Sequence, residues 1–267
     1  MNVHSVSLKG RRDQNEDKHT IILNCNGKNK NIKNVNFFGV YDGHGGKHIS
    51  KCLSKNLPTF FVDNRVQYPL KPTYVTSVYK HVQDTLRTKY KQIATECGST
   101  CLVAVHFKKE NDHYLNILNT GDSRCIMCRD NIALSLTKDH KPNWPEERTR
   151  IENLGGKIYR DEHKEYRIGQ LSVSRAFGDL NEEPFVTNMP EQFVYKLETN
   201  DKFVVIACDG LWDVFENQEV VNYILANCYD STTGQRIKKN INIARKLAEY
   251  AILRGTGDNV TIIVIFL

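Results

Sequence analysis

The sequence predicts an α+β fold: a central β-sandwich of two antiparallel sheets, flanked by pairs of α-helices in a four-layer α/β/β/α arrangement. Two observations support this expectation. Several short β-branched or aromatic runs follow one another without intervening helices, which favours antiparallel pairing over βαβ units. Segments with helical periodicity lie between the groups of strands, so pairs of helices are expected to cover the outer faces of the two sheets.

The strand candidates are rich in β-branched and aromatic residues, which fit a pleated, half-buried surface. They are HTIILN at 19–24, VNFFGVY at 35–41, STCLVAVHF at 99–107, YLNILNT at 114–120, FVVIAC at 203–208 and VTIIVIFL at 260–267. A segment rich in Asn, Gly and Lys at 24–34 separates the first two candidates. It predicts a hairpin loop between them.

Three further segments carry helical signals. Apolar residues recur at intervals of three and four over 72–93. The same spacing runs over 237–251 and is expected to end at Gly255. The segment at 145–154 begins with proline, has two glutamates in its first turn and is expected to stop at the following Gly-Gly pair.

Composition is that of an ordinary globular chain: of 267 residues, 40% are hydrophobic and 25% are charged. No repeat or low-complexity linker divides it, so residues 1–267 are expected to form a single domain. No apolar stretch approaches the roughly 18–20 residues of a membrane span, and the N-terminus lacks a signal-peptide core. We therefore expect an intracellular protein, cytoplasmic, nuclear or both, with no membrane partner.

The eight cysteines are scattered, mostly through apolar strand-like runs. Buried thiols in a reducing compartment explain this pattern better than a disulfide framework. Cys125 and Cys128 form a CxxC pair, for which a zinc or redox site is the alternative. In a strand, however, positions three apart point to opposite faces, and no second pair follows at zinc-site spacing.

The net charge of +6 raises the possibility of a nucleic-acid partner. The basic residues are nevertheless spread out, without an aromatic-interleaved stripe. The small clusters are Lys28, Lys30 and Lys33, and Lys238 and Lys239. A solvated surface that helps to steer acidic, phosphorylated substrates is the preferred interpretation, and no nucleic-acid partner is expected.

Acidic residues stand repeatedly where an apolar strand begins or ends. Asp42 and Asp209 follow strand candidates and precede glycine, Asp122 closes LNILNTGD, and Asp258 directly precedes the last candidate. Strand ends project side chains from a rigid frame, and oxygen ligands suit hard cations such as Mg²⁺ or Mn²⁺. Any one Asp-Gly could be a simple turn, but together with Glu16 the pattern predicts a two-metal hydrolase on a β scaffold.

The segment VYDGHGG at 40–46 resembles the hallmark of the type 2C metal-dependent protein phosphatases. The family's other motifs follow its order over about residues 5–267. They are GRRDQNED at 10–17, ECGSTCLVA at 96–104, TGDSR at 120–124, TKDHKP at 137–142, LSVSRAFGD at 171–179, ACDGLWDV at 207–214 and GDNVTIIV at 257–264. Eight motifs in order make the resemblance very specific.

This resemblance implies a protein serine/threonine phosphatase with two divalent cations, Mn²⁺ or Mg²⁺. Asp42 would bridge the two ions, and the carbonyl of Gly43 would bind one of them. Asp209 and Asp258 would bind the other. Glu16 would hold a metal-bound water.

Further positions match residues that support the metals or contact the substrate. Asp17 would stand beside Glu16 in a supporting role. Asp122, with Asp209 and Asp213, resembles a weaker third-metal site seen in parts of the family. Arg12 matches the arginine that grips the phosphate, although its neighbour Arg11 is an alternative.

His44 matches the histidine thought to act as general acid. The alternative is that it caps the helix expected to follow it. In the implied mechanism a metal-bridging hydroxide attacks the phosphorus in line, and protonation of the serine or threonine oxygen helps this poor leaving group to depart. No cysteine is followed by arginine at the Cys-x5-Arg spacing, which excludes the cysteine-phosphatase mechanism.

The expected partners are phosphoserine and phosphothreonine proteins, and the expected state is a monomer. A charged segment at 157–170 occupies the place of the family's variable flap, and it either contacts substrate or is a solvated loop. Three alternatives remain at this point: a scaffold without metals, a metal-dependent nuclease, and a phosphatase of small monoesters.

Overall fold

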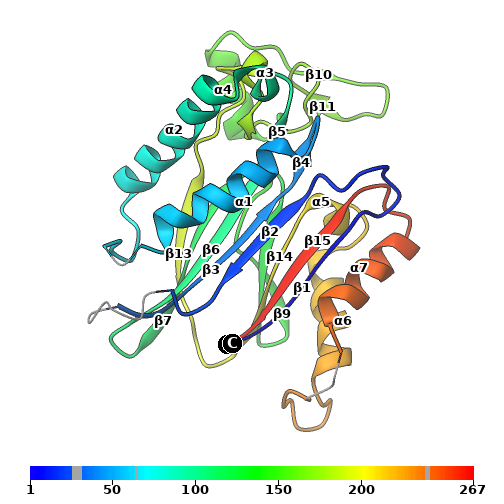
Figure 1. The fold of residues 1–267 in the computed structure, drawn as a ribbon. Coiled ribbons are helices and arrows are strands. Elements are labelled where there is room, and N and C mark those ends of the chain that lie inside the picture. Colours follow the sequence, from blue (N-terminus) through cyan, green and yellow to red (C-terminus); the bar gives the residue numbers. More distant parts are fainter. Residues whose placement is uncertain (26–31, 64, 238–240) are drawn as a thin grey trace.

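The computed structural model describes residues 1–25, 32–63, 65–237 and 241–267 (Figure 1). Most of the predicted hairpin loop at 24–34 lies outside this part of the chain, although the strands on either side of it pair as predicted. Four of the five lysines in the small basic clusters also lie outside the described residues: Lys28, Lys30, Lys238 and Lys239. For the fifth, Lys33, only the backbone is described.

Two five-stranded sheets, in which all neighbouring strands are antiparallel, form the centre of the fold. One has the order β1 (Asn2–Leu8), β15 (Val260–Phe266), β14 (Asp201–Ala207), β8 (Arg124–Arg129) and β9 (Ile132–Ser135). The other has the order β13 (Glu191–Lys196), β7 (Asp112–Thr120), β6 (Cys101–Lys109), β3 (Ile32–Tyr41) and β2 (Lys18–Ile22).

Every predicted strand is present. Of the other strands in the two large sheets, β8 was recognised only as the strand-like run around Cys125 and Cys128, and β1, β9 and β13 were not predicted. All three lie at sheet edges and have mostly exposed or half-buried residues. An edge strand needs little apolar surface, so its sequence carries a weaker signal than that of a central strand.

The middle core lies between the sheets, where Phe38 and Val40 of β3 pack with Ile206 of β14 and Ile263 of β15. The alternate residues of each strand face the helices instead. Cys125 accordingly belongs to the middle core, whereas Cys128 faces the outer core of the same sheet. The prediction that these two thiols point to opposite faces is confirmed, and all eight cysteines are free.

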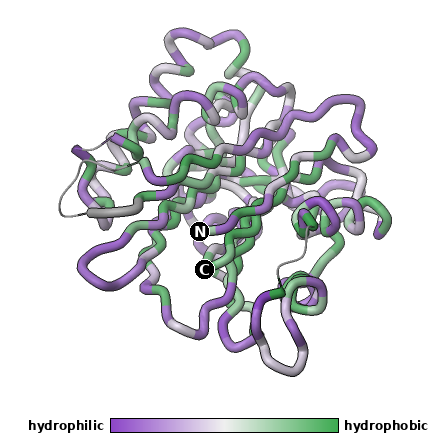
Figure 2. The backbone as a smooth tube through the Cα atoms, turned by 60° about the horizontal axis from the view of Figure 1, so that its bottom comes forward, coloured by the Kyte–Doolittle hydropathy of each residue, from purple (hydrophilic) through white to green (hydrophobic). Residues whose placement is uncertain are grey.

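Helices cover both outer faces, so the predicted four-layer α/β/β/α arrangement is confirmed (Figure 1). Helices α1 (His48–Phe61) and α2 (Pro72–Lys89) pack on the sheet that contains β3. Helices α6 (Asn217–Cys228) and α7 (Ile243–Leu253) pack on the sheet that contains β15. Figure 2 shows apolar strands at the centre and more hydrophilic loops at the periphery.

Two predicted helix boundaries were wrong. The helix expected over 72–93 ends at Lys89, because Tyr90 leaves the helical conformation before the short α3 (Lys91–Ala94). The helix expected from 237 begins only at Ile243, because the side chain of Asn242 accepts a hydrogen bond from the backbone N–H of Arg245 and caps it. The third helix, α4 (Pro145–Asn153), ends before its Gly-Gly pair as predicted.

Short elements complete the end of the sandwich that carries the acidic residues. A three-stranded sheet has the order β12 (Phe177–Gly178), β5 (Gly98–Ser99) and β4 (Gly43–His44). A hairpin of β10 (Tyr159–Arg160) and β11 (Tyr166–Arg167) stands beside it, and the 3₁₀ turn η1 (Leu180–Glu182) follows β12 in the chain. Within the described residues, no helix combines the length and the apolar character needed to cross a membrane.

Candidate active site

All eight residues predicted to bind metal or to act in catalysis line one cleft of about 490 Å³. They come from chain segments that meet at one end of the sandwich: the β1–β2 connection, the end of β3, the turn after β7, the start of α5 (Asp209–Trp212) and the approach to β15. They are Arg12, Glu16, Asp42, Gly43, His44, Asp122, Asp209 and Asp258. We call this the acidic cleft.

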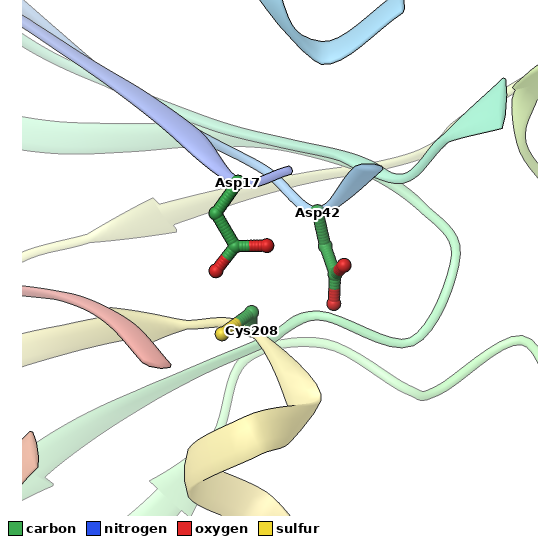
Figure 3. Close-up of side chains that lie close together, drawn as sticks. All are labelled: Asp17, Asp42 and Cys208. Atoms are coloured by element: carbon green, nitrogen blue, oxygen red, sulfur yellow. The ribbon is translucent and has the colours of Figure 1, made fainter. Parts of the chain in front are cut away.

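Asp42, which lines the acidic cleft, also belongs to a cluster with Asp17 and Cys208 behind the cleft surface (Figure 3). One potential ligand atom from each residue lies within 4.8 Å of the others. Asp17 is 1% exposed, and neither of its carboxylate oxygens makes a hydrogen bond, nor does Oδ1 of Asp209. Buried carboxylate oxygens without partners are costly unless a cation balances them, so this donor set fits hard divalent cations.

Burial dominates the electrostatics of these acids. It raises the pKa of Asp42 well above its usual range, and the nearby carboxylates of Asp17 and Asp209 raise it further. The pKa of Asp209 is raised in the same way by burial and by its acidic neighbours Asp122 and Asp213. Burial also raises the pKa of Asp17, and the nearby Thr261 and Cys208 offset this only in part.

The backbone of Asp42 is held in place from the neighbouring strand. The N–H of Asp42 donates to Oγ1 of Thr100 at 3.1 Å, and the N–H of Thr100 donates to the carbonyl of Asp42 at 2.8 Å. Thr100 in turn shares a 2.9 Å hydrogen bond with the hydroxyl of Ser123, next to Asp122. Two of the acidic segments are therefore tied together through buried hydroxyl groups.

Asn259 organises the loop that carries Arg12 and Glu16. Its Oδ1 accepts from the N–H of Glu16 at 2.8 Å, and its Nδ2 donates to the carbonyls of Lys9 and Gln14. Asn259 was not among the residues predicted from the sequence, where the available signal was its position directly after Asp258.

Two basic side chains contact the acidic residues directly. Arg12 donates from Nη2 to Asp258 at 2.6 Å, and the Arg12 side chain is 58% exposed at the rim of the cleft. Lys141 forms an ion pair with Asp122, which is nearly buried. Burial lowers the pKa of Lys141, but Asp122 and Asp209 outweigh this and leave it raised. Lys141 was likewise not among the residues predicted from the sequence, because its contact with Asp122 forms only when the chain folds.

His44 lies in β4 and faces a buried carboxylate. Its Nε2 is 2.9 Å from Oδ1 and 2.8 Å from Oδ2 of Asp179, and the Asp179 side chain is only 4% exposed. A Cβ at Gly98 would collide with both groups, so glycine is required there. Burial opposes protonation of His44, but the hydrogen bond and charge of Asp179 outweigh it, and the pKa of His44 is raised.

The helix-cap alternative for His44 is wrong. Helix α1 begins at His48, and its N-cap is Lys47, which makes no side-chain capping hydrogen bond. His44 belongs instead to the strand β4, where it pairs with Gly98.

The charged segment at 157–170 forms the β10–β11 hairpin. Arg167 lines the acidic cleft and is held by ion pairs to Asp161 and Glu165. Lys164 has a φ of +68° within the exposed turn and does not line the cleft. Of these two basic residues of the segment, therefore, only Arg167 lines the cleft.

An α/β/β/α sandwich with buried carboxylates gathered at one end is typical of a cation-dependent hydrolase. Comparison with known proteins is more specific. The family model described as protein phosphatase 2C matches residues 1–260. The chain therefore belongs to the protein phosphatase 2C family, whose members are metal-dependent serine/threonine protein phosphatases.

Individual relatives agree with this assignment. A PP2C-like domain-containing protein of Acanthamoeba polyphaga mimivirus is 42% identical over 174 residues, which cover 60% of this chain and 96% of the relative. The integrin-linked kinase-associated serine/threonine phosphatase 2C of Mus musculus is 35% identical, over 96% of this chain and 70% of the relative. A crystal structure of a phosphatase from a pathogenic strain of Toxoplasma gondii has the same fold, with a TM-score of 0.79 at 22% identity over 99% of this chain and 92% of that one.

Proposed function

We propose that this chain hydrolyses phosphoserine and phosphothreonine in protein substrates, with two divalent cations, Mn²⁺ or Mg²⁺, held in the acidic cleft. The observation that carries the proposal is that carboxylates with buried, unpaired oxygens, those of Asp17 and Asp209, lie in or behind the cleft that Arg12 and His44 also line. We further propose that residues 1–267 form one catalytic domain, active as a monomer and without a nucleic-acid partner.

In this proposal Asp42, the carbonyl of Gly43, Asp209 and Asp258 would hold the two cations, and Glu16 would act on them through a water molecule. Asp17, behind Asp42, adds buried negative charge that favours cation uptake. When bound, two such cations supply a nucleophile from water near neutral pH and balance charge on the phosphate.

Arg12 is proposed to hold the phosphate. Its guanidinium lies at the exposed rim, where a planar set of donors can bind two phosphate oxygens at once. Its contact with Asp258 keeps it next to the proposed cation positions.

We expect Arg12→Ala to raise KM for a phosphopeptide at least about tenfold, since a charge-assisted bidentate contact contributes about 1.5–3 kcal/mol. Affinity for Mn²⁺, measured by calorimetry, should change much less. Arg11→Ala is the matched control, because Arg11 does not line the acidic cleft. Unchanged phosphopeptide kinetics in the Arg12 variant would contradict this role.

His44 is proposed to donate a proton to the departing serine or threonine oxygen. Such an alkoxide is a poor leaving group, and a positioned acid contributes typically about 10²–10⁴-fold to such steps. Asp179 is proposed to orient His44 and to favour its protonated form, which agrees with the raised pKa of this histidine.

A weaker third cation is proposed at Asp122, Asp209 and Asp213. The ion pair between Lys141 and Asp122 opposes it, because the ammonium group already supplies positive charge at this carboxylate. A third cation must therefore compete with Lys141.

We expect Lys141→Met to tighten the weakest Mn²⁺ site by about tenfold, which corresponds to roughly 1.4 kcal/mol. Calorimetric titration of metal-free protein gives this affinity without any need for turnover. Lys138→Met is the control, since Lys138 is in the same loop but stacks on Trp144 instead. Equal affinities in wild type and the Lys141 variant would show that the ion pair does not compete with the cation.

Phosphate release from a phosphothreonine peptide, with Mn²⁺ and with EDTA, tests the proposed function as a whole. Activity that requires Mn²⁺ and is lost in Asp209→Asn is the expected result. Folded protein without turnover under any metal would favour a scaffold role. Hydrolysis of small monoesters but not of peptides would favour a different substrate, and cleavage of DNA or RNA with a steep salt dependence would favour a nuclease.

A further inference from the structure

One face of α1 carries three exposed lysines, Lys47, Lys51 and Lys55, which we call the lysine row. They are four residues apart, so their side chains follow one another along the same side of the helix. Helix α1 contains no acidic residue, and within the described part of the chain no acidic side chain forms an ion pair with any of the three. Their charge is therefore available to a partner.

The row begins at the acidic cleft. Gly43, His44 and Gly45 line the cleft, and Lys47 follows as the N-cap of α1. Because an α-helix rises 1.5 Å per residue, the row extends about 12 Å from Lys47 to Lys55, away from the cleft. Figure 1 shows α1 starting next to β4 and running outward along the sheet.

The helix that presents the row is firmly attached. Its inner face buries Ile49, Leu53 and Leu57, and these residues alternate along the helix with the lysines. On the side towards β2, Oγ1 of Thr20 donates to the carbonyl of Ser54 at 2.8 Å. The lysine row is therefore held at a constant distance from the cleft.

A fourth lysine extends the positive charge towards β2. Lys18 is half-buried, and its Nζ donates to the carbonyls of Asp17 and Asn15. Burial lowers its pKa, the charge of Asp17 opposes this, and the charges of Lys47 and Lys51 lower the pKa again.

Other basic side chains that line the cleft are ion-paired. The β10–β11 hairpin contributes Arg167, which Asp161 and Glu165 neutralise, and Arg12 is paired with Asp258. The lysine row, in contrast, has no such acidic partner within the described residues.

We propose that the lysine row is a docking surface for acidic residues of the phosphoprotein substrate, so that the enzyme prefers sites with Asp or Glu on one side of the phosphorylated residue. This inference rests on the proposed phosphatase function. An extended peptide advances about 3.3 Å per residue, so a 12 Å row spans three to four residues of substrate. Exposed charges of this kind mainly affect the rate at which enzyme and substrate associate, and hence KM. Dissolved salt screens them and weakens this effect.

The test compares three phosphothreonine peptides: one with acidic residues only before the phosphothreonine, one with them only after it, and a neutral one. At low salt, wild-type kcat/KM should be at least about tenfold higher for one acidic peptide than for the neutral peptide. Added NaCl should reduce this preference. In Lys51→Glu/Lys55→Glu the preference should disappear, while turnover of p-nitrophenyl phosphate stays unchanged; Lys47 is left intact because it adjoins the cleft.

The control is Lys109→Glu/Lys246→Glu, which makes the same change in net charge at exposed positions on β6 and α7. This control variant should keep the preference for the acidic peptide. The variant Lys51→Gln/Lys55→Gln should lose the preference, and it replaces the glutamate variant in the test if that variant does not fold. No acidic preference in wild type, or a preference that survives in the row variants, would overturn the inference. No release from any peptide would contradict the proposed function and this inference with it.

Discussion

Replacing Asp42 with asparagine is expected to abolish phosphate release and also to raise the melting temperature of the metal-free protein. Both effects have one cause. Asp42 is a half-buried carboxylate near the buried Asp17 and near Asp209, an arrangement that is unfavourable without cations and necessary for binding them. The amide keeps the shape of the side chain but removes its charge.

The loss of activity should be at least about 10³-fold, since the metals supply several kcal/mol of charge stabilisation. In EDTA the variant should melt a few degrees above wild type, as expected when about 1 kcal/mol of repulsion is removed. Saturating Mn²⁺ should reverse this order, because cation binding stabilises only a protein that retains the site. Asp112→Asn, in an exposed ion pair with Lys196, is the control and should change neither property appreciably.

The metal-free protein is expected to become less stable as pH rises through the range in which Asp42 ionises. Because the folded-state pKa of Asp42 is raised above its unfolded value, its protonated form favours folding. Metal-free wild type should therefore lose stability as pH rises from about 4 through the raised pKa, and the asparagine variant should lose less. Thermal melts of both proteins in EDTA across this range measure the difference. Identical slopes would show that Asp42 is not the source of the repulsion.

Replacing Asp179 with asparagine is expected to slow hydrolysis of a phosphothreonine peptide by about 10²-fold or more, the typical contribution of a general acid. Hydrolysis of p-nitrophenyl phosphate should change only a few-fold, because nitrophenolate departs without protonation. Asparagine also tolerates the left-handed backbone at this position, where φ is +48°, so the fold should survive.

Two further measurements separate this role from a structural one. The alkaline limb of the peptide pH–rate profile should move to lower pH, because His44 loses the carboxylate that raises its pKa and becomes deprotonated earlier. The double variant His44→Ala/Asp179→Asn should be no slower than His44→Ala, since Asp179 acts through His44. Equal losses on the peptide and the aryl ester would indicate general damage instead.

Most of the central strands, the four-layer arrangement and the acidic residues that line the cleft were predictable from the amino-acid sequence. Central strands are buried on both faces, so their apolar runs are long and easily recognised, whereas the edge strands β1, β9 and β13 carry little apolar signal. An aspartate next to a central strand, such as Asp42 or Asp209, is predictable for the same reason: the strand end sets its position.

Which groups surround these acids depends on how the chain folds and was not predictable from the sequence. Asp179 is 135 residues from His44, and Asn259 is 243 residues from Glu16, yet each pair is in direct contact. Lys141 reaches Asp122 from a loop whose sequence carries no sign of that contact. Such partners come from loops. The local sequence of a loop can specify a turn, but it does not specify where that turn lies in the folded protein. That place depends on how the two sheets pack, because the packing gathers the loops at one end of the sandwich.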